Sequence, residues 1–277
     1  MNDRQSEILS YVTEHGHAKN SDLMRLVGNC SSMTLWRDLT KLEQDGLVIR
    51  TRGGVIASHE ANAEREANFS LRSIQNTEAK EEIAAIGSAI LHQNHAYFLD
   101  AGTTVLALTR RLPEGHFNIV TSAANTATEI ARRNGYTVTL LGGQISGSTF
   151  SCSGPQTDEM LKSMNIDIAV MATSGFSVNG NFTSGALTEA QLKRQVITKA
   201  ALTVMLMDNS KIGRSHPFTF STLDDIDVLV GDSALSDEFL HIAEEHNVRV
   251  FSPRDGLTNE ERYQIYHEIF LRKYGYT

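Results

Sequence analysis

Apolar residues recur at helical spacing in three short segments at the start of the chain. The segments cover residues 3–14, 21–27 and 32–45, and polar residues suited to a helix N-cap precede each of them. Gly28 and Gly46 follow the second and third segments, where a left-handed residue readily ends a helix. The pattern predicts three short amphipathic helices, the first of which stops at a loop.

The third of these helices has an inner and an outer face. Leu35, Leu39 and Leu42 lie at i, i+4 and i+7 on the inner face of a helix that Ser31 or Ser32 caps. The opposite side and its flanks carry Met33, Thr34, Trp36, Arg37, Thr40, Lys41 and Gln44. These outward side chains are therefore placed to contact a partner.

A short basic hairpin follows the three helices. The run LVIRTRGGVI at 47–56 predicts two strands around a turn that carries Arg50, Arg52 and Gly53. Three small helices and a hairpin predict a winged helix-turn-helix, which we assign to residues 1–57. In such a fold the outer helix enters the major groove of double-stranded DNA, and the wing arginines meet phosphates or the adjacent minor groove.

The rest of the chain predicts a second domain of a different class. Residues 58–76 are polar and charged, as expected of a linker, and Thr77 caps a helix to about Leu91. The predicted strands are AYFL at 96–99, NIVT at 118–121, VTLL at 138–141, DIAVMA at 167–172, LTVMLM at 202–207, DVLV at 227–230 and VRVF at 248–251. The helical patterns between and after them lie at 106–112, 126–133, 158–164, 189–200 and 237–246.

Apolar strands joined by crossover helices predict a doubly wound, mostly parallel α/β domain over residues 77–252. The tail 253–277 places Tyr263, Tyr266 and Phe270 near one helical face. We expect it to form a helical extension that packs on this domain or on a partner subunit.

Polar and glycine residues follow four consecutive predicted strands. They are Asp100–Thr104, Thr121–Asn125, Gly142–Gln144 and Thr173–Gly175. Ligands bind at the carboxyl ends of the strands in such sheets, and a glycine turn that opens a helix suits a phosphate. One such turn alone is more often structural, so the joint placement of all four is what predicts a binding site.

Three charged residues further along the chain have two interpretations each. Glu189 and Lys193 lie at i, i+4 on one predicted helix, where they form an ordinary surface pair or contribute to the site. Lys211 follows the strand at 202–207 and is either a solvated loop charge or a cation for a phosphate.

Composition narrows the class of protein. The 277 residues are 40% hydrophobic and 21% charged, with no long apolar run and no apolar signal at the start, so we expect a cytoplasmic protein without a membrane partner. Cys30 and Cys152 suggest neither a disulfide framework nor a zinc site, and we expect no metal and no cofactor. The net charge is −8, but residues 1–56 carry seven basic and seven acidic groups, which leaves the deficit in the second domain.

Both halves resemble a known family. The run TLWRDLTKLEQDGLVIRTRGGV at 34–55 is similar to the helix-turn-helix and wing of the DeoR-type bacterial repressors. The Asp-x-Gly-Thr-Thr turn at Asp100, the glycine pair at Gly142, the run TSGALTEAQLKRQVI from Thr183 and the Asp-x-Ser-Lys element ending at Lys211 resemble the sensor domain of that family. The chain departs from the family pattern at Trp36, where an arginine is usual, and in the loop Thr121–Asn125.

The resemblance implies a repressor of carbohydrate catabolism whose sensor domain is related in fold to ribose phosphate isomerase and binds a phosphorylated sugar. The residues expected to meet operator DNA are Ser31, Ser32, Met33, Thr34, Trp36, Arg37, Thr40, Lys41, Arg50, Arg52 and Gly53. The residues expected around the effector are Asp100, Gly102, Thr103, Thr104, Ser122, Asn125, Gly143, Gln144, Thr173, Ser174, Gly175, Glu189, Lys193 and Lys211.

One expectation about assembly and two alternatives for the function remain at this point. A homodimer or higher oligomer would present two recognition helices about 34 Å apart along DNA. A sugar phosphate isomerase with an appended DNA-binding module would use Glu189 or Asp100 to move a proton. A regulator that answers to a nucleoside or an unphosphorylated sugar would differ in what fills the loop at Thr103 and Thr104.

Overall fold

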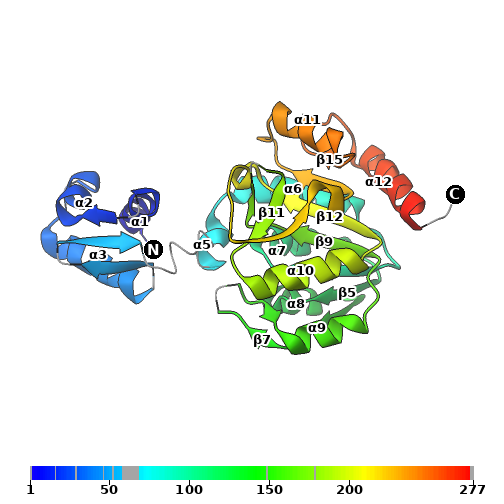
Figure 1. Cartoon of the computed structure of the whole chain (residues 1–277), viewed down its shortest axis with the longest axis horizontal. Helices are drawn as coiled ribbons and strands as arrows, with labels where there is room; N and C mark the ends of the chain where they lie inside the picture. The colour runs from blue at the N-terminus through cyan, green and yellow to red at the C-terminus, as the bar shows by residue number, and fades with distance from the viewer. Residues whose placement is uncertain are drawn as a thin grey trace. The chain divides into compact units, whose positions relative to one another are not determined.

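The computed structural model describes residues 2–15, 17–28, 30–45, 47–51, 53–57, 69–147, 149–177 and 179–274. The chain divides into two compact units, residues 1–67 and residues 68–277. Each unit has a hydrophobic core of its own, and Figure 1 shows the elements of both.

Unit 1 is a small winged helix-turn-helix. Its described helices are α1 (Asp3–His15), α2 (Asn20–Leu26) and α3 (Ser32–Gln44), and its strands are β1 (His17–Lys19), β2 (Val48–Thr51) and β3 (Gly54–Ala57). The strands form an antiparallel sheet in the order β1-β3-β2. The predicted leucine face of α3 lies in the core with Ile8, Val12 and Leu23.

Strand β1 was not predicted, since the sequence analysis placed a loop there. It has three residues, of which Ala18 alone is buried, so it leaves no alternating pattern to detect. Its pairing with β3 explains the second glycine of the wing, Gly54. A Cβ atom on Gly54 would lie 2.3 Å from the carbonyl oxygen of Ala18, so only glycine allows the two strands to approach this closely.

The centre of unit 2 is a sheet of seven parallel strands, and they are the seven that the apolar runs predicted. They are β4 (Ala96–Leu99), β5 (Phe117–Thr121), β6 (Tyr136–Leu140), β9 (Ile168–Ala172), β12 (Leu202–Met207), β14 (Val228–Gly231) and β15 (Arg249–Phe251). The order across the sheet is β15-β14-β12-β9-β4-β5-β6, and every neighbouring pair is parallel. The strand order reverses between β4 and β9, which makes this the topological switch point of a doubly wound fold.

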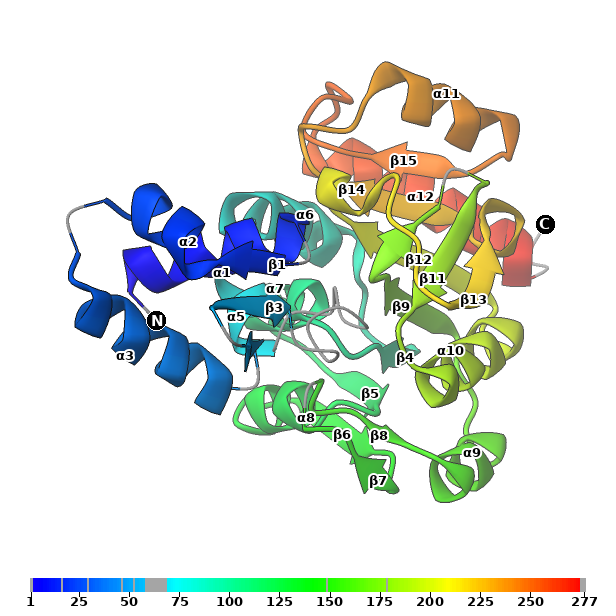
Figure 2. The same cartoon turned by 60° about the vertical axis from the view of Figure 1, so that its left-hand side comes forward.

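Helices cover both faces of this sheet (Figure 2). One core gathers side chains from α6 (Thr77–Ile90), α7 (Thr103–Arg111), α8 (Ala124–Ala131) and α12 (Asn259–Tyr274). The other gathers side chains from α9 (Pro155–Lys162), α10 (Leu187–Lys199) and α11 (Asp237–Glu245). Tyr266 and Phe270 of α12 are buried in the first core, so the C-terminal helix packs on its own unit.

Several short elements were not predicted. They are α5 (Phe69–Ile74), β7 (Gln144–Ile145), β8 (Cys152–Ser153), β10 (Gly175–Phe176), β11 (Asn181–Ser184), β13 (Phe218–Thr222) and the 3-10 turns Asn209–Lys211 and Leu223–Asp225. Helix α5 falls inside the range 58–76 that was expected to be a linker, and the boundary between units lies before it. Six residues are too few to show a helical period, and residues 58–68 lie outside the described part of the chain.

Candidate functional site

The outward face of α3 is the candidate DNA-contacting surface of unit 1. Met33 is 60% exposed and Trp36 is 50% exposed, and Arg37 is also exposed, as the helical spacing predicted. Ser31 caps the helix, because its hydroxyl accepts a hydrogen bond from the backbone N–H of Thr34 at 3.1 Å. The cap fixes where the helix begins and therefore which residues form its outward face.

A wing residue is bound to the same helix. The guanidinium of Arg50 lies 5.0 Å from the centre of the Trp36 ring, and its Nη1 donates to the Thr40 hydroxyl at 3.1 Å. The Thr40 hydroxyl in turn donates to the carbonyl oxygen of Trp36 at 2.8 Å. Trp36, where the family usually has an arginine, therefore holds Arg50 against the recognition helix by cation–π stacking. Arg52 lies outside the described residues, and Gly53 occupies the turn with φ of +91°.

A buried carboxylate fixes the orientation of α3 against α1. Asp38 is 5% exposed and accepts hydrogen bonds from Arg4 at 2.5 Å and Gln5 at 2.8 Å. Burial by itself would raise the pKa of Asp38, but the bonds from Arg4 and Gln5 outweigh it and hold the pKa below its ordinary value. The guanidinium of Arg4 is therefore paired with a carboxylate inside unit 1.

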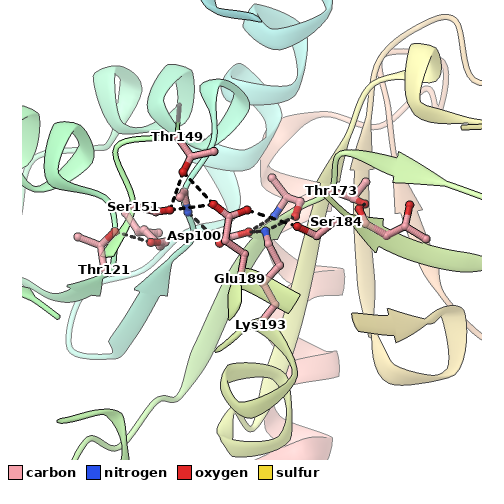
Figure 3. Close-up of polar contacts among 12 residues, drawn as sticks. Asp100, Thr121, Thr149, Ser151, Thr173, Ser184, Glu189 and Lys193 are labelled. Atoms are coloured by element: carbon pink, nitrogen blue, oxygen red, sulfur yellow. Dashed lines mark hydrogen bonds and ion pairs between the residues drawn. The ribbon is translucent and has the colours of Figure 1, made fainter. Parts of the chain in front are cut away.

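The candidate effector site of unit 2 begins with a buried ion pair at the topological switch point (Figure 3). Asp100 follows β4 and is 3% exposed, and its carboxylate accepts a hydrogen bond from the ammonium of Lys193, which is 8% exposed. The backbone N–H groups of Ala101 and Ala172 also donate to Asp100, at 2.8 Å and 3.0 Å. Lys193 donates further to the carbonyl oxygen of Ala172 at 2.8 Å and lies 5.1 Å from the centre of the Phe220 ring.

This pair joins the ends of β4 and β9 to helix α10. Complete burial raises the pKa of Asp100 above its ordinary value, and the Lys193 ammonium acts in the opposite direction. The alternative of a surface pair between Glu189 and Lys193 is wrong. Lys193 turns to Asp100, a partner 93 positions away in the sequence.

Glu189 lies one turn before Lys193 on α10 and is surrounded by hydroxyl groups. Its Oε1 accepts from Thr149 at 2.8 Å and Ser151 at 3.0 Å, and its Oε2 accepts from Ser184 at 3.3 Å. The three hydroxyl residues are each at most 5% exposed, whereas Glu189 is partly exposed (Figure 3). These three residues were not predicted as site residues. They belong to segments without a strong period. The density of serine and threonine at 146–153 was the available signal for Thr149 and Ser151, and Ser184 lies in the run that begins at Thr183.

The turn after Asp100 opens helix α7. Gly102 has φ of +155°, a conformation that favours glycine, and the first two helical residues are Thr103 and Thr104. These threonines are 9% and 7% exposed, and no side-chain hydrogen bond of either is present in the described part of the chain. The first N–H groups of a helix have no partner within the helix and carry a partial positive charge, which suits an anion.

The loop after β5 lies at the adjacent strand end. Ser122 is 1% exposed, and its carbonyl oxygen accepts from the N–H of Cys152 at 2.7 Å. Asn125 uses its Oδ1 to accept from the N–H of Thr126 at 2.9 Å, while its buried Nδ2 has no hydrogen-bond partner in the described structure. An amide donor left unpaired in this way is available to a bound ligand.

The remaining predicted residues are described by their local contacts and exposure. A Cβ atom on Gly143 would approach Thr157 Oγ1 to 2.2 Å, and one on Gly175 would approach the carbonyl oxygen of Arg214 to 2.6 Å. Thr173 donates to the carbonyl oxygen of Gly175 at 2.7 Å. Gln144 lies in the exposed strand β7, and Ser174 lies in the bend after β9. The ammonium of Lys211 is 4.0 Å from Asp208, which follows β12.

The described residues contain no group of three or more His, Cys, Asp or Glu side chains arranged to hold a metal ion. Among the described helices, none combines the length and the apolar character that a membrane span requires.

Comparison with known proteins places both units in one family. Residues 4–61 match the model of the DeoR-like helix-turn-helix domain, and residues 75–233 match the model of the DeoR C-terminal sensor domain. The HTH-type transcriptional repressor GlcR of Bacillus subtilis is 27% identical over 90% of this chain and 95% of its own length. The L-fucose operon activator of Haemophilus influenzae is 27% identical over 90% of this chain and 98% of its own length.

Among solved structures, ribose 5-phosphate isomerase A from Methanocaldococcus jannaschii matches 50% of this chain and 55% of its own, with 15% identity and a TM-score of 0.36. The two family models together cover the recognition helix, the wing and the strand ends described above. The chain therefore belongs to the DeoR family of transcriptional regulators.

Proposed function

We propose that this transcriptional regulator is a cytoplasmic repressor of a carbohydrate-catabolism operon, and that a phosphorylated sugar bound by unit 2 controls its binding to operator DNA. The observation that carries the proposal is the pairing of two complementary features at one strand edge. The N-terminus of α7 suits a phosphate, and the carboxylate of Glu189 accepts hydrogen bonds from hydroxyl groups. A sugar phosphate presents both kinds of group.

The buried ion pair brings these two features together. Asp100 lies two residues before Gly102, and Lys193 lies one helical turn after Glu189. Because Asp100 and Lys193 are bonded to each other, the glycine turn and the first turn of α10 are held at the same end of the sheet (Figure 3). We assign Asp100 and Lys193 a positioning role, and assign effector contacts to Gly102, Thr104 and Glu189, with Thr103 and Asn125 beside them.

Binding rather than catalysis fits the carboxylates of this site. Asp100 already accepts three hydrogen bonds and is almost completely buried, so the C–H group next to a substrate carbonyl cannot approach it as it would approach a general base. Glu189 is bonded to three hydroxyl groups of the protein. A hydroxyl of the effector would replace one of these donors without any chemical step.

On the DNA side, we propose that α3 enters the major groove with Arg37, Met33 and Trp36 toward the bases. The wing at Arg50 lies beside it. A homodimer would present two such helices about one turn of DNA apart, roughly 34 Å. Dimerisation also compensates for a DNA-binding unit with no excess of basic residues, because the two weak contacts then reinforce each other.

The test is fluorescence anisotropy of the protein on the DNA upstream of its gene, titrated at fixed salt with sugar phosphates and with the same sugars lacking phosphate. We expect one phosphorylated sugar to change the operator affinity at least about tenfold, which corresponds to a coupling of about 1.4 kcal/mol. The substitution Thr104→Val should remove the response while operator binding stays unchanged, and Thr104→Ser should keep it.

Two results would refute the proposal. If the unphosphorylated sugars act as well as the phosphorylated ones, the α7 N-terminus is not a phosphate site. If the protein converts a sugar phosphate and shows no preference for any DNA sequence, it is an isomerase-like enzyme.

A further inference from the structure

The segment Thr149–Cys152 connects the candidate effector site to a different part of unit 2. Thr149 and Ser151 both donate to the same oxygen of Glu189, and Phe150 stands between them. Phe150 has φ of +55°, a left-handed conformation that is uncommon for residues other than glycine. The two bonds to Glu189 therefore flank a backbone conformation that the sequence alone would not favour.

The same segment is bonded to the loop after β5. The carbonyl oxygen of Phe150 accepts from the N–H of Ala124 at 2.9 Å, and the N–H of Cys152 donates to the carbonyl oxygen of Ser122 at 2.7 Å. Ala124 is the first residue of helix α8, next to Asn125. Two sides of the candidate effector site, Glu189 and the β5 loop, thus hold Phe150 in place.

The ring of Phe150 contacts helix α5. It meets the Phe69 ring edge to face with ring centres 5.5 Å apart, and it is 41% exposed. Phe69 is the first residue of α5, two positions after the boundary at which unit 1 ends. Phe150 therefore links the Glu189 cluster to Phe69 at the start of α5.

The other end of α5 is anchored. The ammonium of Lys80 donates to the carbonyl oxygens of Arg72 and Gln75, and Lys80 is 6% exposed. Burial, together with the positive charge of Lys211, lowers the pKa of Lys80 to about 8. Lys80 fixes the C-terminal end of α5. We therefore expect the loss of the Phe69 contact to move the N-terminal end of α5, which is the end closer to unit 1 in the sequence.

We propose that Phe150 is a positioning residue that sets the placement of α5 according to what Glu189 binds, so that effector occupancy is passed to the chain leading to the DNA-binding unit. The inference rests on the proposed function. A sugar hydroxyl that donates to Glu189 displaces the Thr149 or Ser151 hydroxyl. The left-handed Phe150 then loses a bond that maintains it, and a return to negative φ carries the ring away from Phe69.

The test separates effector binding from effector response. We compare the wild type with Phe150→Ala, Phe69→Ala and the control Ile145→Ala, which removes an apolar side chain that is 52% exposed on strand β7. Calorimetry measures binding of the sugar phosphate, and anisotropy measures operator affinity with and without it. We expect both phenylalanine variants to bind sugar phosphate and operator with affinities within about twofold of wild type. The change in operator affinity that the effector causes should be at least about tenfold smaller in these variants than in the wild type.

Two additions exclude a merely structural role. Phe150→Leu keeps an apolar contact with Phe69 and should restore part of the response. Hydrogen exchange of residues 69–76 should change on adding effector to the wild type and to Ile145→Ala, and should not change in Phe150→Ala. Phe69→Ala alters no residue of the candidate effector site. This variant therefore tests the same inference if Phe150→Ala fails to fold.

The outcomes distinguish this inference from the proposed function. A wild type that responds to no sugar phosphate overturns the proposed function and the inference with it. A wild type that responds, together with Phe150→Ala and Phe69→Ala variants that respond equally well, overturns the inference alone. Variants that bind effector normally and no longer respond support it.

Discussion

Replacing Lys193 by methionine tests the buried ion pair that holds the candidate effector site together. Methionine keeps most of the apolar stem of lysine, which packs beside Phe220, but removes the ammonium that Asp100 accepts from. Asp100 then stays 3% exposed with no opposite charge beside it. Breaking a buried pair by removing one partner costs about 3–5 kcal/mol, because an uncompensated charge is left in the interior.

For a domain of roughly 200 residues, each kcal/mol lowers Tm by about 2–4 °C, so we expect a loss of about 6–20 °C in a thermal melt of Lys193→Met. The matched control is Lys199→Met, at an exposed position of the same helix, which should change Tm by less than about 2 °C.

The effect should also depend on pH. Without the ammonium, burial raises the pKa of Asp100 further above its ordinary value. As the pH falls through that raised pKa, the folded variant takes up a proton that the unfolded chain binds only near pH 4. The stability deficit of Lys193→Met should therefore shrink as the pH is lowered from about 8 to about 5. A deficit below about 1 kcal/mol, or one that does not change with pH, would refute the account of Asp100 as a buried charge that needs Lys193.

Two other predictions test the DNA-facing surface and the aromatic cluster around α12. Arg37→Ala should weaken operator binding more than about tenfold with no change in Tm, whereas Arg25→Ala, on the exposed side of α2, should change it less than about threefold. Equal effects of the two would remove Arg37 from the interface. Burial and the neighbouring histidines lower the pKa of His92 to about 4. As the pH falls, the unfolded chain therefore binds a proton at this histidine at a higher pH than the folded chain does. The stability of the wild type should fall as the pH drops from about 6.5 to about 4. His92→Phe, which keeps a ring beside Tyr266, should flatten that slope in urea melts at a series of pH values, and an unchanged slope would assign the acid sensitivity to other groups.

The architecture could be predicted because its main signals are local. Strands β9, β12 and β14 are buried on both faces, which gives each a continuous apolar run in the sequence, and the helices between the strands keep their period. The edge strands β6 and β15 are only partly buried. The elements that escaped prediction are two to six residues long. Strands β7, β8 and β10 have two residues each, so alternation has no length in which to appear, and α5 has less than two turns.

The candidate site could be predicted in part, for a related reason. The position of Asp100, Gly102 and Thr104 at a strand end follows from the strand pattern and the rule for doubly wound sheets. The partners of Glu189 and Lys193 cannot be predicted from the same pattern, because contacts between distant segments override the spacing of charges along a helix. Glu189 and Lys193 stand four residues apart, yet each is bonded to residues of other segments.

Some of the basic residues of unit 1 are paired with other residues of the same unit. Arg4 is bonded to Asp38, and Arg50 is stacked on Trp36, so neither contributes a fully free charge to a phosphate. Arg37 is exposed on α3, and the described residues provide it with no ion pair. Because each phosphate contact adds a separate salt-dependent increment to the affinity, we expect unit 1 of a single chain to bind DNA weakly. In the proposed homodimer, control by an effector needs no change in α3 itself. A shift of α5 that altered how the two DNA-binding units reach successive grooves would be enough to lose the second contact and most of the affinity.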